Sequence, residues 1–131
     1  MRLNPIILLG GGGHCKSAID VIEAEGKFEI IGILDLEEKT GDYVLDYEIL
    51  GTDDLIEGYI SSCKYFLVTL GQIKSVKPRI DLYTKIKKAG GILPTIVSPD
   101  AYIGKNVVIG DGNIIMHSAI INAGAEIGNN C

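Results

Sequence analysis

The chain has 131 residues, a formal net charge of −5 and a pI near 4.9, with 47% hydrophobic and 22% charged residues. This balance is typical of a globular protein with a packed core and argues against disorder. Because the overall charge is acidic, it attracts neither nucleic acid nor an anionic membrane surface, and we expect neither as a partner.

The cysteines and the N-terminal residues indicate a reducing compartment. Cys15, Cys63 and Cys131 are an odd number at wide spacing, with no C-x-x-C pair. The opening from Met1 to Leu9 lacks the length and the cleavage-site pattern of a secretory signal. No stretch approaches the roughly 18 apolar residues of a membrane span. We therefore expect a cytoplasmic protein.

The first third of the chain predicts a β-α-β unit. The apolar run Ile6–Leu9 precedes four glycines and is typical of a buried strand in a parallel sheet. The apolar residues within 18–22 predict a helix, for which Gly26 supplies the C-terminal stop. A second apolar strand is expected from Phe28 to Leu34, and it ends at Asp35.

The middle of the chain predicts further strands and helices in alternation. Residues 36–50 lose the pattern, so we expect a loop or irregular segment there, with a short helix near Thr52. A third strand is predicted over 65–70, and Ser75 begins a helix that runs to about Lys88. An extended fourth strand leads out of this region. Four strands and about three helices predict a small, open, parallel α/β sheet of the Rossmann-like type, with room for a mononucleotide.

The last part of the chain has an aliphatic residue at every sixth position. Such hexapeptide repeats are the signature of a parallel β-helix, in which each hexad forms a short strand. The hexads amount to under two coils, so we expect incompletely covered aliphatic residues and association or fraying there. We assign residues 1–95 to a Rossmann-like domain and residues 96–131 to an incomplete β-helix. The repeated positions are Val97, Ile103, Ile109, Ile115, Ile121 and Ile127.

The glycine run 10–13 lies where the first strand turns into the first helix. This is the carboxyl edge of the sheet, where such sheets bind ligands, and glycines let a phosphate approach the amides of a helix N-terminus. A tight turn alone explains one or two glycines more easily than four. Asp35 is placed to accept hydrogen bonds from a ribose or base, and Lys16 could reach a phosphate or be solvated. His14, as a lone histidine, is more often a hydrogen-bonding group than a catalyst.

Two other enzyme classes are disfavoured by the motifs. For the dinucleotide fingerprint G-x-G-x-x-G, the frame from Gly10 places Cys15 at the third glycine, and the frame from Gly11 places Lys16 there. This weakens the case for a nicotinamide-dependent oxidoreductase. A hexapeptide-repeat carbonic anhydrase needs several histidines to hold zinc, whereas the hexads offer His117 alone, so we expect no metal site.

The run ILLGGGGHCK from Ile7 to Lys16, taken with the tail from Ser98 to Cys131, resembles the NeuD/PglD-type sugar O- and N-acetyltransferases. The resemblance spans the whole chain. It implies a Rossmann-like domain that binds a nucleotide-linked sugar, followed by a left-handed parallel β-helix. It also implies a homotrimer in the full-length protein, acetyl-CoA bound between neighbouring subunits, and transfer of the acetyl group to an amine or hydroxyl of the sugar.

The same resemblance implies which residues touch the nucleotide-linked sugar. The glycine turn and the two polar residues after it match the loop of the family that contacts this ligand. Cys15 stands where the family usually has glycine or another small residue, and we expect it to fit. The implied substrate-binding residues are Gly11, Gly12, Gly13, His14, Lys16, Asp35, Gly71, Gln72 and Arg79.

The catalytic base of the family is a histidine of the β-helix, typically in an H-D or H-E pair. This sequence has no such pair, and the family pattern places the histidine one or two hexads beyond Cys131. His117 matches an ordinary coil residue, for which we expect an exposed or subunit-facing position. The chain would then carry the sugar-binding part of the enzyme and be inactive alone. The alternative is a stand-alone nucleotide-sugar-binding or regulatory module without catalysis.

Overall fold

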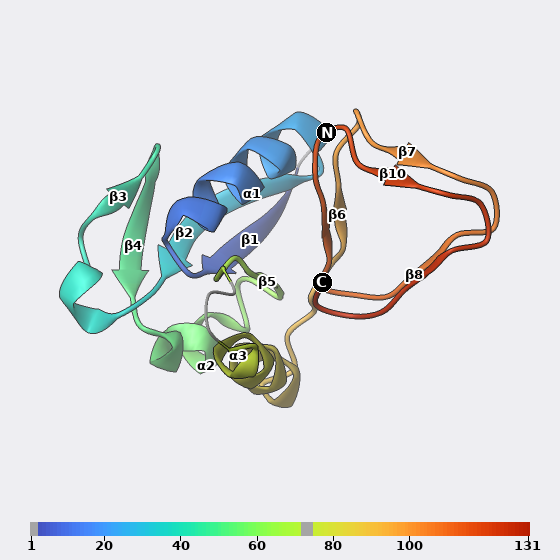
Figure 1. Cartoon of the computed structure of the whole chain (residues 1–131). Coiled ribbons are helices and arrows are strands. Elements are labelled where there is room, and N and C mark those ends of the chain that lie inside the picture. Colours follow the sequence, from blue (N-terminus) through green and yellow to red (C-terminus); the bar gives the residue numbers. More distant parts are fainter. Residues whose placement is uncertain (1–2, 72–74) are drawn as a thin grey trace.

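A computed structural model describes residues 3–71 and 75–131 and shows an α/β part joined to a three-sided stack of short strands (Figure 1). The chain begins with β1 (Asn4–Leu9), α1 (Gly13–Glu25) and β2 (Phe28–Leu34), and β1 pairs with β2 in parallel. Helix α1 ends at Gly26, whose φ of 73° is left-handed. The predicted β-α-β unit and its helix stop are therefore confirmed.

The segment expected to be irregular contains two strands. After the short 3₁₀ turn η1 (Glu37–Lys39), β3 (Tyr43–Val44) and β4 (Tyr47–Gly51) form an antiparallel hairpin, and β4 pairs in parallel with β2. The loop prediction for residues 36–50 is therefore wrong at residues 43–44 and 47–50. Val44 and Ile49 are the buried apolar side chains of this hairpin. Two such residues among acidic residues and tyrosines set up no period that the sequence would reveal.

The next elements complete the sheet. The turn η2 (Asp53–Leu55) and helix α2 (Ile56–Tyr59) form the short helix expected near Thr52. They are followed by β5 (Tyr65–Val68) and α3 (Lys77–Lys88). Among the described residues the sheet has the order β3-β4-β2-β1-β5. Three of the four expected strands are present, and the hairpin adds two. The fourth expected strand, over 92–97, is not in the sheet, because Ile92 makes only a single bridge to Tyr65 and Ile96–Val97 pairs with Ile114–Ile115.

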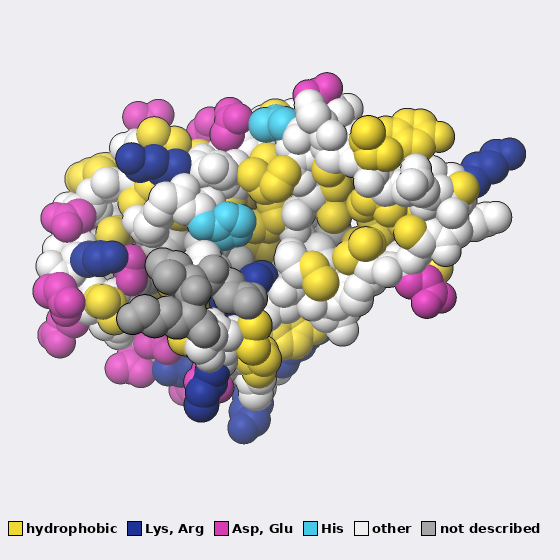
Figure 2. Space-filling model, in the orientation of Figure 1, with side chains coloured by type: hydrophobic (Ala, Val, Ile, Leu, Met, Phe, Trp, Pro, Cys, Tyr) yellow, Lys and Arg dark blue, Asp and Glu magenta, His cyan; other side chains and the backbone are white. Residues whose placement is uncertain are grey.

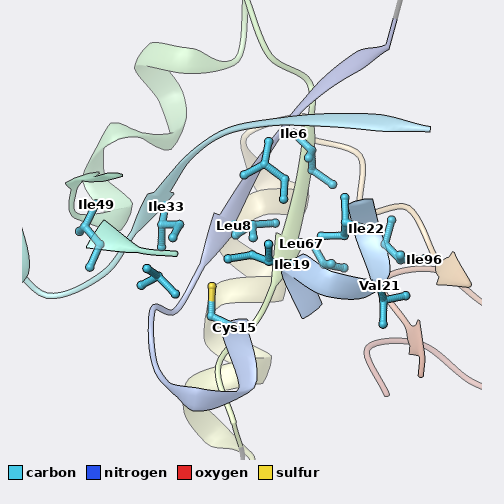
Figure 3. Packing of buried hydrophobic residues seen from close by; sticks show 12 residues of the cluster. Ile6, Leu8, Cys15, Ile19, Val21, Ile22, Ile33, Ile49, Leu67 and Ile96 are labelled. Carbon is cyan, nitrogen blue, oxygen red and sulfur yellow. The ribbon is translucent and has the colours of Figure 1, made fainter. Parts of the chain in front are cut away.

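Strand β1 lies between β2 and β5 in the sheet and is buried on both faces, which explains its continuous apolar run. Ile6 and Leu8 pack against α1, as Figure 3 shows, whereas Ile7 and Leu9 pack on the opposite face against α2 and α3. The helices contribute Ile19 and Ile22 from α1, Ile56 from α2 and Ile86 from α3.

The hexads form the coils of a parallel β-helix. Each short strand has two residues and ends at a repeated aliphatic position. The first three strands each pair in parallel with the strand three hexads later. Six strands thus fill two layers, slightly more than the expected count of under two coils. The strands are β6 (Ile96–Val97), β7 (Tyr102–Ile103), β8 (Val108–Ile109), β9 (Ile114–Ile115), β10 (Ile120–Ile121) and β11 (Glu126–Ile127).

The coils contact the α/β part through α1 and α3. The buried end of β6 lies on α1, where Glu25 Oε2 accepts a hydrogen bond from Val97 N at 3.1 Å. From α3, Tyr83 Oη donates to Asp111 Oδ1 at 2.5 Å.

Charged side chains gather over the α/β part, while the coils present more hydrophobic ones (Figure 2). Across residues 3–71 and 75–131, no helix has both the length and the apolar character needed to cross a membrane.

Candidate nucleotide-sugar site

The first two glycines of the turn lie close to neighbouring segments of the chain. Gly10 has a φ of 116°, and a Cβ there would lie 2.8 Å from backbone atoms of Leu70. A Cβ on Gly11 would lie 3.0 Å from Asp35 Oδ2. The carbonyl of Gly10 accepts a hydrogen bond from Thr69 Oγ1 at 2.7 Å. A side chain at Gly10 would therefore collide with the backbone of Leu70, while one at Gly11 would require Asp35 to shift by a few tenths of an ångström.

The next two glycines meet no such requirement. Gly12 has a φ of −86°, and neither Gly12 nor Gly13 has a positive φ or any described atom within 4 Å of an added Cβ. Both residues are exposed at the start of α1, where no side chain caps the helix and no acidic residue lies in the first turn. The amides at this helix start are therefore accessible to an anion, such as a phosphate.

His14 follows the exposed glycines in the first turn of α1 and lies next to Gly71, which comes after β5. A Cβ added to Gly71 would lie 3.6 Å from His14 Cβ, so the two predicted residues are neighbours. Burial of the imidazole, and secondly the positive charge of Arg79, lower the pKa of His14 below its ordinary value. Within the described part of the chain the imidazole makes no hydrogen bond. A neutral imidazole next to the turn can donate a hydrogen bond to a ligand through one ring nitrogen and accept one from it through the other.

Asp35 holds the glycine turn against the end of β2. Its Oδ2 accepts from Gly11 N at 2.8 Å, its Oδ1 accepts from Leu36 N at 2.8 Å, and Lys39 Nζ lies 3.5 Å from Oδ2. Since the side chain is only 11% exposed, these contacts fix it firmly. Lys16, by contrast, lies exposed on α1.

The remaining predicted residues are less closely tied to the turn. Arg79 Nη2 donates to the carbonyl of Asn130 at 2.9 Å, so its hydrogen bonds join α3 to the last coil. Its Nε is buried and has no partner among the residues that the structure describes. Gln72 lies outside the described residues.

A cleft of about 290 Å³ opens beside the turn, at the carboxyl ends of β1 and β2. Its volume is close to the lower end of the usual range for small-molecule pockets, about 300–1,000 Å³. Of its lining, the sequence singled out Asp35 as a ligand contact and Gly10 as part of the glycine turn. It did not reveal the residues of η2 and α3, because tertiary packing alone brings these elements to this edge. The lining residues are Leu9, Gly10, Leu34, Asp35, Leu36, Asp53, Leu70, Pro78, Asp81 and Leu82.

Two further residues singled out in the sequence have structural roles. Cys15 is buried beneath the turn, as expected for a small residue there, and burial raises the pKa of its thiol to about 11 (Figure 3). His117 is 37% exposed and joins the coils to α1, since its Nδ1 lies 2.5 Å from Ser98 Oγ and its Nε2 lies 2.9 Å from Asp20 Oδ2. The exposed position of His117 agrees with the expectation, whereas its contacts with Ser98 and Asp20 were not predicted. In the described residues, no group of three or more His, Cys, Asp or Glu side chains is arranged to hold a metal ion.

The solved structures that resemble this chain include acetyltransferases. A variant of perosamine N-acetyltransferase from Caulobacter crescentus, solved with CoA and GDP-perosamine, superposes with a TM-score of 0.86 at 26% identity over 98% of this chain. The acetyltransferase domain of PglB from Neisseria gonorrhoeae superposes with a TM-score of 0.81 at 23% identity over 97% of this chain, which shows the shared fold. This chain spans 59% and 60% of those two chains, respectively.

Sequence comparisons give a viral relative and a matching family profile. Uncharacterized protein L142 of Acanthamoeba polyphaga mimivirus is 33% identical over 125 residues, which are 94% of this chain and 23% of that protein. The profile of the PglD N-terminal domain matches residues 5–86, from β1 into α3 and therefore across the glycine turn. The match covers more than half of the sequence, and the chain therefore belongs to the PglD N-terminal domain family.

Proposed function

We propose that this chain supplies the nucleotide-sugar-binding part of an acetyltransferase, which transfers an acetyl group from acetyl-CoA to an amine or hydroxyl of a nucleotide-linked sugar. The observation that carries the proposal is the exposed start of α1 at Gly12 and Gly13, beside a cleft at the sheet edge, in a chain of this family. A diphosphate placed there meets free amides and the positive end of the helix dipole.

The proposed ligand lies along the edge of the sheet. The base and ribose occupy the cleft beside Asp35, and the diphosphate lies over the open glycines, with Lys16 near its charge. The sugar extends toward His14 and the backbone of Gly71, where the neutral imidazole accepts or donates a hydrogen bond. Gly11 keeps the turn in place through Asp35, and Arg79 and Gln72 complete the proposed set.

The chemistry follows from the acceptor group. The sugar amine or hydroxyl loses a proton to a general base as it attacks the thioester carbonyl, and CoA leaves as its thiol. No residue of this chain is assigned as that base. The acetyltransferases named above support the reaction class, since one was solved with CoA and GDP-perosamine.

We further propose a two-part chain that works as a homotrimer, with residues 1–95 binding the sugar nucleotide and residues 96–131 starting the β-helix. An apolar patch on the coils supports an interface between subunits. Ile120 of β10 pairs in register with Tyr102 of β7, and these side chains are 72% and 62% exposed. Burying such a patch against another subunit is favourable.

Acetyl transfer by the native polypeptide tests the proposal. The protein isolated from its own host is incubated with acetyl-CoA and a panel of amino sugars linked to uridine, cytidine or guanosine phosphates, and release of the CoA thiol is followed. We expect release with at least one member of the panel. Nucleotide-sugar binding without release would instead favour a binding module, and the absence of both would overturn the proposal.

A further inference from the structure

We infer that the cleft selects guanine as the base of the nucleotide, with the carboxylates of Asp53 and Asp81 accepting hydrogen bonds from the base. The inference rests on the proposed function and specifies the nucleotide part of its substrate.

The cleft offers apolar walls and hydrogen-bond acceptors. Its described lining consists of leucine, proline and glycine together with three aspartates, and includes no lysine, arginine, amide or hydroxyl side chain. Leucine and proline side chains can contact the two faces of a flat base. Since ionised carboxylates only accept hydrogen bonds, the side chains of the cleft favour a ligand edge that carries donors.

The carboxylates of Asp53 and Asp81 keep part of their acceptor capacity within the described residues. Lys85 Nζ lies 3.3 Å from Asp53 Oδ2, and Lys77 Nζ lies 2.9 Å from Asp81 Oδ2. These lysines do not line the cleft, and they offset the negative charge of the aspartates. The second oxygen of each aspartate, Oδ1, has no hydrogen bond within the described residues. Asp35 differs, because both of its oxygens already bind backbone amides of the turn.

The four common bases differ in the donors that they present. Guanine carries N1–H and the N2 amino group side by side, a pair that a carboxylate can accept in a bidentate manner. Uracil carries a single N–H between two carbonyl oxygens, which an aspartate would repel. Cytosine and adenine each carry one amino group next to an acceptor nitrogen. The lining therefore fits guanine best and uracil worst.

Calorimetry of this chain with free nucleotides tests the inference directly. The chain is titrated with GDP, IDP, UDP, CDP and ADP under one buffer condition. We expect GDP to bind at least about tenfold more tightly than UDP, because charged hydrogen bonds of this kind are strong. IDP lacks the N2 amino group, so its affinity should lie between those two.

Matched variants assign the effect to the carboxylates. D53N and D81N should each weaken GDP about tenfold or more while UDP changes less than about threefold. D46N serves as the control, since Asp46 is exposed between β3 and β4 and does not line the cleft. Thermal melting of each variant verifies that it folds.

Three results would overturn the inference. If all five nucleotides bind with similar affinity, or if UDP binds most tightly, the base is not selected in this way, while nucleotide binding itself stands. If GDP binds best but neither D53N nor D81N weakens it, the two carboxylates do not read the base. If no nucleotide binds at millimolar concentration, the inference and the proposed function both fail.

Discussion

At the scale of single residues, the glycines of the turn divide into two pairs. Gly10 leaves no room for a side chain and Gly11 leaves little, while Gly12 and Gly13 are open to solvent. The sequence predicted a ligand-binding turn from four glycines in a row. It could not divide them, because the division depends on the φ of Gly10 and on Leu70 and Asp35, which approach from elsewhere in the chain.

This division predicts opposite effects for two alanine substitutions. G10A should lower the free energy of unfolding by about 2 kcal/mol or more, because its φ of 116° and the Leu70 backbone both exclude a Cβ. G13A should leave stability within about 0.5 kcal/mol of the native value, since nothing lies near its Cβ. It should nevertheless weaken nucleotide-sugar binding about tenfold, because the added methyl group lies where the phosphate approaches.

Urea denaturation and calorimetry with GDP-linked and UDP-linked sugars give the two quantities separately. G58A is a suitable control, because Gly58 has an ordinary backbone angle, open space at its Cβ and no place in the cleft. Unchanged ligand affinity in G13A would place the phosphates elsewhere.

The buried thiol of Cys15 gives stability a pH dependence. Its pKa rises from an ordinary value of 9.0 to about 11 in the folded chain, so the folded state keeps a proton that the unfolded state loses. The stabilisation is complete below pH 9 and is lost as the pH rises to about 11. A shift of this size corresponds to roughly 2–3 kcal/mol. Urea titrations between pH 8 and 11 should show this fall, and C15A should reduce it. An equal fall in C15A would assign the effect to other groups.

At the scale of elements, the repeats were the most predictable feature and the hairpin the least. The period of six fixed both the existence and the spacing of the strands, because every repeated aliphatic residue faces the stacked core. Strands β3 and β4 gave no such signal, since few of their residues are buried.

A second periodicity became visible in the structure. Left-handed residues recur at six-residue intervals along the coils, at Asn106, Gly112, Ser118, Gly124 and Asn130.

The coil corners predict a position-specific effect of glycine replacement. Gly124 has a φ of 78°, whereas Gly128 has no positive φ, and neither has described atoms near an added Cβ. G124A should therefore cost about 1 kcal/mol of unfolding free energy through backbone strain alone. G128A, the matched control, should change it by less than about 0.5 kcal/mol. Chemical denaturation compares the two. Equal losses would mean that the corner does not require a left-handed residue.

At the scale of the whole molecule, the α/β part and the coils are joined by polar contacts that the sequence did not predict. Their partners come from distant segments, as in the contact of His117 with Asp20 and that of Tyr83 with Asp111. The same reason explains why the cleft lining was missed. The position of a ligand site at the sheet edge follows from topology, but the side chains that reach it from η2 and α3 depend on packing.

The contact of α3 with the coils predicts a spectroscopic change. The hydrogen bond to Asp111, together with burial, raises the pKa of Tyr83 to about 12. In D111A this pKa should fall toward the ordinary value of 10, and the lost contacts to Tyr83 and Lys87 should lower stability by about 1 kcal/mol. Ultraviolet titration measures the tyrosines, with Y83F to assign the signal. Tyr47, also raised to about 12, should stay unchanged as an internal control. A Tyr83 pKa that stays near 12 in D111A would contradict this contact.

Backbone NMR during titration with a nucleotide-linked sugar tests the proposed site most directly. We expect the largest amide shift changes at Gly12, Gly13 and His14 and a second group around Leu36 and Asp53, with the coils little affected. Saturable changes confined to other surfaces, or none at millimolar ligand, would contradict binding of the nucleotide sugar at the glycine turn.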